Sequence, residues 1–274
     1  MTEIIWRGMT RVELDAAYNN GLAVKNSAEK MAEWTERSAR LRKERPETLD
    51  IPYGPKPRNR IDIFRSGHAS APLFAFIHGG YWQRNSKEVF SCVAAGPLAR
   101  GFDVALIGYT LAPEATLTEI VGEVRAALRW LRQHGSDHGI SANRILVSGW
   151  SAGGHLTTMA LGEADAGLSI SGVFDLEPCR LNYLNDALHL SENEVQALSP
   201  IRQQPSQSGP LIVAFGEAEL PELQRQSRDY HDVRMKVGVA SELMPLAGHD
   251  HFSIIEELAS PDGKLAQAAA RLMR

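Results

Sequence analysis

The sequence predicts an α/β fold in which a mostly parallel central sheet is covered by helices on both faces. From Arg60 onward, short apolar runs alternate with helix-like segments, as expected for strands joined by crossover helices. The chain has 274 residues, enough for one large α/β domain with a sizeable core. A glycine-flanked serine at one strand-to-helix junction is the third observation, and it connects the fold with a chemistry.

The predicted strands are short apolar runs bounded by polar or turn-forming residues. They cover residues 61–64, 73–77, 104–107, 145–147, 168–173, 211–215 and 241–246. The clearest helix spans residues 118–134, where apolar side chains recur on one stripe. Residues 253–273 predict a second helix.

Two regions depart from this alternation. Residues 1–60 are polar, look helical over 11–17 and 28–45, and end in a proline-rich stretch. We expect them to form an N-terminal helical arm that packs on a core domain over residues 61–274. Residues 176–209 are long, polar and irregular, so we expect a small cap-like insertion beside the active-site mouth.

Composition excludes several classes of protein. The formal net charge is −4 and no large basic block is present, which argues against a nucleic-acid partner. No apolar run approaches the length of a membrane span, and the N-terminus lacks the apolar region of a secretory signal. We therefore expect a cytoplasmic protein without a membrane partner. A homodimer is compatible with the sequence.

Ser151 is the glycine-flanked serine at the strand-to-helix junction. Residues 149–153 are Gly-Trp-Ser-Ala-Gly, after a predicted strand and before a helix-like run. Gly-x-Ser-x-Gly in this context is a nucleophile elbow, where a strained turn lifts the hydroxyl above the sheet edge. The helix that follows aims its N-terminal N–H groups at the same place. The sequence therefore predicts Ser151 as the nucleophile of an α/β-hydrolase fold.

A second motif supplies an oxyanion hole. The run 73–77 ends in His78-Gly79-Gly80-Tyr81-Trp82, which matches the His-Gly-Gly loop of lipases and esterases. Backbone N–H groups held in advance stabilise the charge that develops during acyl transfer. We assign the hole to the N–H groups of Gly79, Gly80 and Ala152, with Tyr81 as a candidate further donor. His78 is expected to hold the loop in shape.

Three aromatic residues are candidates for substrate binding. Tyr81 and Trp82 follow the glycine loop, and Trp150 precedes the nucleophile. Tyr81 and Trp82 could equally be packing residues, because large aromatic side chains dominate cores as well as pockets.

The base should follow the last strand, and the acid should follow the strand before it. His249 and His251 both lie after the run 241–246, and His251 is the first choice because it opens the final helix-like segment. No aspartate follows the run 211–215, so the acid is Glu219 or Glu217. Asp250 is expected to be structural. The histidines lack metal-ligand spacing, so we expect no metal and no cofactor.

These residues resemble those of kynurenine formamidases (arylformamidases), near the hormone-sensitive-lipase group of the α/β-hydrolase superfamily. The resemblance covers most of the chain from about Tyr18 onward and rests on five segments. They are residues 17–20, 78–82, 148–156, 171–178 and 250–256. The fourth, Ser-Gly-Val-Phe-Asp-Leu-Glu-Pro, is the most specific, because generic esterases do not usually carry it.

The resemblance implies roles for individual residues. The segment that begins at Glu219 is similar to a family segment that begins Asp-Ser-Pro-Glu-Phe, which implies Glu219 as the acid. It likewise implies His251, just before Phe252, as the base. Glutamate in place of aspartate is one departure, and Trp150 in place of the commoner histidine is another. By the same analogy, residues 18–20 are candidates to cap the pocket.

The activity that the resemblance implies is hydrolysis of an N-formyl aryl amine such as N-formylkynurenine, with release of formate, as in tryptophan breakdown. Two alternatives stay open. One is a carboxylesterase for small short-chain acyl esters, which would use the same Ser151 chemistry. The other is a non-catalytic scaffold used for binding. For an arylformamidase or a carboxylesterase, the partner is a small molecule with an amide or ester carbonyl.

Overall fold

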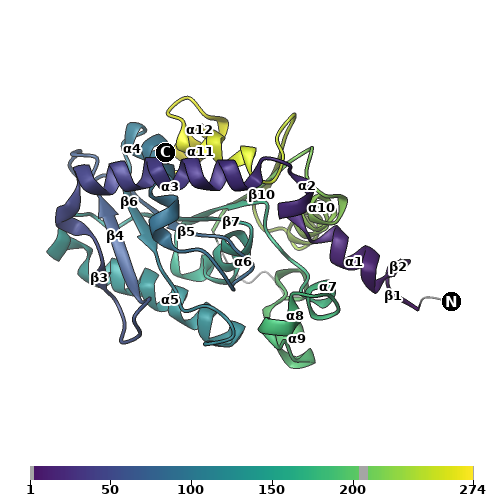
Figure 1. Cartoon of the computed structure of the whole chain (residues 1–274). Helices are drawn as coiled ribbons and strands as arrows, with labels where there is room; N and C mark the ends of the chain where they lie inside the picture. The colour runs from purple at the N-terminus through teal and green to yellow at the C-terminus, as the bar shows by residue number, and fades with distance from the viewer. Residues whose placement is uncertain (1–2, 204–208, 274) are drawn as a thin grey trace.

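An eight-stranded sheet lies at the centre of the computed structural model, which describes residues 3–203 and 209–273 (Figure 1). Its strand order is β10-β9-β8-β7-β5-β6-β4-β3. The pairs β3–β4 and β4–β6 are antiparallel and the other neighbours are parallel. The strands are β3 (Ile51–Pro52), β4 (Arg60–Phe64), β5 (Leu73–Ile77), β6 (Asp103–Ile107), β7 (Ile145–Trp150), β8 (Ala166–Ile170), β9 (Leu211–Gly216) and β10 (Ser241–Leu246).

Every apolar run predicted as a strand overlaps a strand of this sheet, and two strand ends lie three residues from the predicted ones. The run 145–147 continues to Trp150, so β7 leads directly into the serine turn. The run 168–173 ends at Ile170, because Ser171 adopts a left-handed backbone conformation with φ 51°. That conformation cannot continue a strand, so the prediction for 171–173 was wrong.

Side chains of the sheet alternate between two hydrophobic layers. In β5, Phe74 and Phe76 point into one cluster, while Leu73, Ala75 and Ile77 point into the other. This is the period of two that a pleated strand imposes. Both faces must therefore be covered by helices.

The helices divide between the two faces of the sheet (Figure 1). One face carries α3 (Ser27–Glu44), α4 (Ala95–Ala99), α11 (Glu256–Ala259) and α12 (Lys264–Leu272). The other face carries α5 (Leu117–His134), α6 (Ala152–Met159) and α10 (Pro221–Lys236). Short 3₁₀ helices are η1 (Pro46–Thr48), η2 (Lys87–Ala94), η3 (Gly135–His138), η4 (Leu161–Glu163), η5 (Pro200–Arg202) and η6 (Ser253–Ile255).

The C-terminal helix predicted over residues 253–273 is divided into η6, α11 and α12. Helix α11 ends where Ser260 turns to an extended conformation, immediately before Pro261. Pro261 lacks the N–H that a continuing helix needs and disfavours a helical residue before it. The prediction of one continuous helix was therefore wrong.

The N-terminal segment contributes to both hydrophobic layers. It forms β1 (Ile4–Trp6), β2 (Met9–Thr10), α1 (Arg11–Ala17) and α2 (Asn20–Ala23) before the long helix α3. Leu14 and Tyr18 are buried in one cluster, and Trp34 of α3 in the other. Its docking thus depends on long-range packing with the sheet layers.

The irregular stretch after β8 forms three short helices, α7 (Glu177–Arg180), α8 (Asn185–Leu188) and α9 (Glu192–Leu198), which lie together beyond the sheet (Figure 1). Residues 204–208 of the predicted insertion lie outside the described residues. Within the described ranges, each helix is too short or too polar to cross a membrane.

Candidate active site

Ser151 occupies the sharp turn between β7 and α6. Its backbone has φ 58° and ψ −119°, a strained conformation for a residue with a side chain. Gly153 makes the turn feasible, because a Cβ there would lie 2.0 Å from the carbonyl oxygen of Ile77. The glycine therefore lets α6 begin directly against β5. The structure thus has the local geometry of a nucleophile elbow.

A line of hydrogen bonds connects Ser151 with His251 and Glu219. His251 Nε2 lies 3.1 Å from Ser151 Oγ, and His251 Nδ1 lies 3.0 Å from Glu219 Oε2. Ser151 and His251 are each 3% exposed, and Glu219 is 5% exposed. The three side chains come from the turns after β7, β9 and β10. The arrangement suits proton transfer from the hydroxyl to the imidazole, with the carboxylate orienting the ring.

The alternative base and acid lie elsewhere. His249 Nε2 lies 3.1 Å from Glu257 Oε1, and so its ring is engaged away from Ser151. Glu217 is exposed to solvent on the turn after β9. Asp250 accepts hydrogen bonds from the backbone N–H groups of Phe252 and Ser253, as expected for a structural residue. The structure therefore brings together Ser151, Glu219 and His251 but not His249 or Glu217.

The Glu219 carboxylate has two further donors. Ser171 Oγ and the backbone N–H of Gly216 each donate to Oε1 at 2.6 Å. These bonds fix one oxygen while the other faces His251. Sequence reasoning missed Ser171. The available signal was its place at the head of the 171–178 segment, directly after a predicted strand.

Trp150 supports the same histidine from the other side. Its Nε1–H donates to the carbonyl oxygen of His251 at 2.7 Å. The two rings lie 4.9 Å apart between centroids, at an angle of 37°. Trp150 also lines the pocket beside Ser151. The tryptophan predicted to contact substrate therefore also positions the loop that carries His251.

The glycine loop after β5 lies against the serine turn. A Cβ on Gly79 would be 3.0 Å from Ser151 Cβ, and Gly80 lines the pocket. Gly80 has φ 121°, which glycine adopts without strain. Among the described residues, the N–H groups of Gly79, Gly80 and Tyr81 make no intramolecular hydrogen bond. The N–H of Ala152 opens α6, where it has no acceptor within the helix. These donors are available to a developing oxyanion.

His78 holds the glycine loop from below. Its Nδ1 lies 2.9 Å from the carbonyl oxygen of Gly79, and its ring stacks on Tyr109 with centroids 4.3 Å apart. Complete burial lowers the pKa of His78 to about 4. The imidazole is therefore neutral near pH 7 and donates through Nδ1. This is the loop-holding position expected from the sequence.

Tyr81 and Trp82 have different positions. Tyr81 lines the pocket, and its hydroxyl donates to the carbonyl oxygen of Tyr18 at 2.7 Å and accepts from Asn20 Nδ2 at 3.0 Å. Trp82 is fully buried and packs edge-on against His155 with centroids 5.0 Å apart. The structure does not bring Trp82 into the pocket, because left-handed backbone conformations at both residues turn its ring toward α6.

The pocket above Ser151 is small and has walls from distant parts of the chain. Its volume is about 230 Å³. Its floor consists of the serine turn, the glycine loop and the His251 loop, and its roof comes from the N-terminal segment. The roof residues are Asn19, Asn20, Gly21, Ser27, Ala28 and Met31, and Tyr183 of the insertion completes one wall. Sequence reasoning missed most of the roof.

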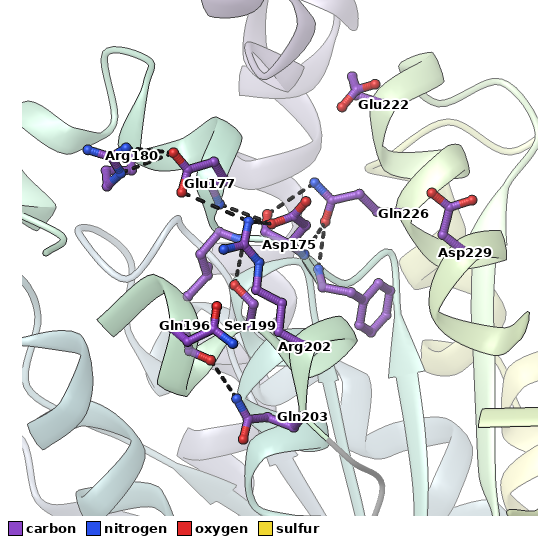
Figure 2. A network of polar contacts seen from close by, with 12 residues as sticks. Asp175, Glu177, Arg180, Gln196, Ser199, Arg202, Gln203, Glu222, Gln226 and Asp229 are labelled. Atoms are coloured by element: carbon purple, nitrogen blue, oxygen red, sulfur yellow. Dashed lines mark hydrogen bonds and ion pairs between the residues drawn. The ribbon is translucent and has the colours of Figure 1, made fainter. Parts of the chain in front are cut away.

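Helix α10 anchors this roof through Tyr18. The Tyr18 hydroxyl donates to Glu222 Oε2 at 3.3 Å and accepts from Gln226 Nε2 at 2.6 Å. Figure 2 shows Gln226 also facing the segment after β8, where its Oε1 accepts from the N–H groups of Phe174 and Asp175. An ion pair between Arg202 and Asp175, 3.1 Å apart, extends this network. One glutamine therefore connects the roof with the insertion.

Similarity to known proteins agrees with this site. A family model described as BD-FAE matches residues 61–172. The kynurenine formamidase of Salmo salar is 28% identical, and the match covers 98% of each chain. The kynurenine formamidase of Drosophila melanogaster is 32% identical, and the match covers 80% of each chain. The chain belongs to the kynurenine formamidase family.

Solved structures confirm the fold of this kynurenine formamidase relative. A structure from Silicibacter sp. tm1040 is 27% identical with a TM-score of 0.84, covering 93% of this chain and 98% of its own. The hyperthermophilic esterase of Pyrobaculum calidifontis is 18% identical with a TM-score of 0.74 over 96% of each chain. The predicted α/β-hydrolase fold and family are thus confirmed, and the chain is a hydrolase of that superfamily.

The two departures from the kynurenine formamidase pattern are both accommodated. The longer side chain of Glu219 reaches His251 while its other oxygen is held by Ser171 and Gly216. Trp150 gains a hydrogen bond to the backbone of His251. Each substitution therefore leaves the line from Ser151 to the carboxylate continuous.

Proposed function

We propose that this protein is a serine hydrolase of the arylformamidase type, which hydrolyses an N-formyl aryl amine such as N-formylkynurenine. The observation that carries the proposal is the line from Ser151 Oγ through His251 to Glu219, with separations of 3.1 and 3.0 Å. Similarity to kynurenine formamidases over nearly the whole chain supports the choice of substrate.

The proposed reaction proceeds through a formyl-enzyme. His251 accepts the hydroxyl proton as Ser151 Oγ attacks the formyl carbon, and Glu219 stabilises the imidazolium. The N–H groups of Gly79, Gly80 and Ala152 stabilise the oxyanion, each contributing about 3 kcal/mol. The C–N bond then breaks, and His251 protonates the leaving amine. Water, deprotonated by His251, attacks the formyl-enzyme and releases formate.

The walls of the pocket support an aromatic leaving group next to a very small acyl group. The volume of about 230 Å³ leaves little space beyond one substituted ring. Apolar contact surface comes from Met31, Trp150, Tyr183 and Phe252. Aromatic rings favour such surroundings through offset or edge-on packing. Formyl, the smallest acyl group, then fits between Ser151 and the glycine loop.

Further parts of the proposal concern organisation and setting. In it, residues 1–60 form an arm on a hydrolase domain over residues 61–274, with residues 176–209 as a cap-like insertion. The enzyme acts without a cofactor on a small molecule in the cytoplasm, in tryptophan breakdown. The proximity of the arm to the pocket supports this division, because residues 19–21 and 27–28 line it.

Kinetics on matched substrates tests the proposal. We expect kcat/KM for N-formylkynurenine to exceed that for p-nitrophenyl acetate, and the products to be formate and kynurenine in equal amounts. Replacing Ser151 with alanine should lower kcat about a million-fold, because the covalent route is lost. A far lower kcat/KM for N-formylkynurenine than for the ester would instead favour a short-chain carboxylesterase.

Covalent labelling separates an enzyme from a binding scaffold. A fluorophosphonate probe should label the wild-type protein but not the Ser151→Ala variant, since it reacts with an activated serine. Absence of labelling in the folded wild type would contradict the proposed mechanism.

A further inference from the structure

The charge of the pocket points to a substrate feature that the formamide group does not explain. Fifteen residues line the pocket, and Arg84 is the one lysine, arginine, aspartate or glutamate among them. No carboxylate of the described residues lines the cavity to balance it. A site with one permanent positive charge and no negative charge favours an anionic ligand.

Arg84 is held close to the reacting groups by its backbone. Its N–H donates to the carbonyl oxygen of Gly80 at 3.1 Å, so it belongs to the same turn as the oxyanion loop. Its side chain is exposed at the pocket. The guanidinium therefore extends from a fixed point beside Ser151.

The guanidinium also lacks a partner within the part of the chain that the structure describes. Arg58 provides a contrast in the same region, because it donates to the backbone carbonyl oxygens of Tyr109 and Asn85. Arg225 is likewise paired with Glu222. Arginine carries five donors in a planar fork that suits a carboxylate. Those of Arg84 are free for a ligand.

The field of Arg84 reaches two other pocket residues. Burial raises the pKa of both Tyr81 and Tyr183, and the positive charge of Arg84 opposes the rise at each. Both phenols line the pocket. Arg84 therefore lies within electrostatic reach of two tyrosines that line the same pocket as Ser151.

We propose that Arg84 binds a carboxylate on the leaving-group side of the substrate, and that the enzyme consequently prefers aryl formamides that carry a carboxylate over those that lack one. The inference rests on the proposed function, since it concerns the same pocket. Arg84 takes no part in the bond-breaking steps; it determines specificity. An amino-acid side chain on the aryl amine, or a carboxylate on its ring, would each supply the anion.

The test compares N-formylkynurenine with its carboxamide, in which an uncharged amide replaces the carboxylate and the α-amino group is kept. We expect the wild-type protein to prefer the carboxylate, and Arg84→Gln to lower the ratio of the two kcat/KM values about ten-fold, as expected for a partly exposed charge-assisted bond. Most of the change should be in KM. Arg84→Lys should retain part of the preference because it keeps the charge.

A control removes the same charge far from the pocket. Arg40 is exposed on α3, and Arg40→Gln should keep the wild-type ratio. An unchanged ratio in Arg84→Gln, or an equal fall in Arg40→Gln, would overturn the inference, because a specific carboxylate contact predicts neither.

Binding without turnover separates this inference from the proposed function. Titration calorimetry of the Ser151→Ala protein should give a lower Kd for N-formylkynurenine than for its carboxamide. In a double variant that also carries Arg84→Gln, the two Kd values should be equal. Equal Kd values in the Ser151→Ala protein would overturn the Arg84 inference. A preference in binding with no formamide hydrolysis by the wild type would instead overturn the proposed function alone.

Discussion

The floor of the pocket is built from turns that follow parallel strands, whereas its roof is built from an N-terminal segment held by distant side chains. Ser151, Glu219 and His251 each lie directly after a strand whose register fixes their positions. Tyr18 and Asn20 have no such support and depend on bonds to α10 and Tyr81. The difference indicates that the sheet determines the chemistry while tertiary contacts determine access.

The largest expected effect on the floor comes from replacing Glu219, the proposed acid of the triad. Glu219→Gln should lower kcat/KM about 10⁴-fold, because the neutral amide no longer orients and stabilises the imidazolium. Glu217→Gln, two residues away on the same turn, should retain wild-type kcat/KM. Steady-state kinetics of the two variants decides the assignment, and a larger loss in Glu217→Gln would move the acid to that residue.

Acid should lower the free energy of unfolding of the protein through two buried histidines, His78 beside the glycine loop and His155 in α6. Burial lowers the pKa of both His78 and His155 to about 4, below their ordinary value of 6.5. The unfolded chain therefore binds protons first as pH falls below 6.5, so stability is lost between pH 6.5 and pH 4. The loss should be on the order of 3 kcal/mol per histidine.

Urea denaturation at pH 7 and pH 4 measures this dependence. His155→Gln should show a smaller loss of stability than the wild type over that interval, whatever its stability at pH 7. His68→Gln, at an exposed position, serves as the control. An identical pH dependence in His155→Gln and the wild type would show that His155 is not responsible.

The smallest expected effect is that of a change in the roof, the substitution of Tyr18 by phenylalanine. Tyr18→Phe removes the hydroxyl between Glu222 and Gln226. Gln226 Nε2 then keeps only its bond to the carbonyl oxygen of Asp175, and the loss of the other acceptor costs about 1–3 kcal/mol. Because the floor stays intact, KM should rise up to about ten-fold while kcat changes less.

Tyr53→Phe provides a matched control for the loss of a phenol hydroxyl. Tyr53 donates to the carbonyl oxygen of Gly108, outside the pocket lining. The Tyr53→Phe variant should have a lower free energy of unfolding than the wild type but the same KM. A change in kcat without a change in KM for Tyr18→Phe would contradict the division between floor and roof.

The difference between elements defined by local sequence and elements defined by tertiary contacts also explains which strands could be predicted. Strands β5 and β10 have the predicted bounds, because each is a continuous run between turn residues. Strands β1, β2 and β3 were not predicted, since elements of two or three residues show no periodicity and depend on their pairing partners. The end of β8 was misplaced because Ser171, not the glycine after it, adopts the left-handed conformation that ends the strand.

Candidate site residues follow the same rule. Local motifs after strands predicted Ser151 and restricted the base to His251 or His249 and the acid to Glu219 or Glu217. The structure brings Ser151, His251 and Glu219 together. Resemblance alone pointed to residues 18–20. Arg84 carried no motif, and Ser171 heads the 171–178 segment but had no predicted role. The importance of both residues comes from neighbours that only the folded chain brings near. For Trp82 both substrate binding and packing stayed open, since its motif position gives no information on which way its ring turns. The ring packs against His155.

The anchoring of Tyr18 has a consequence for synthesis on the ribosome. Its partners Glu222 and Gln226 lie 204 and 208 positions later in the chain. These two bonds, unlike those of the same segment to Tyr81, can therefore form only after α10 has been translated. The active site is completed at the end of translation, although its first residues are made at the beginning.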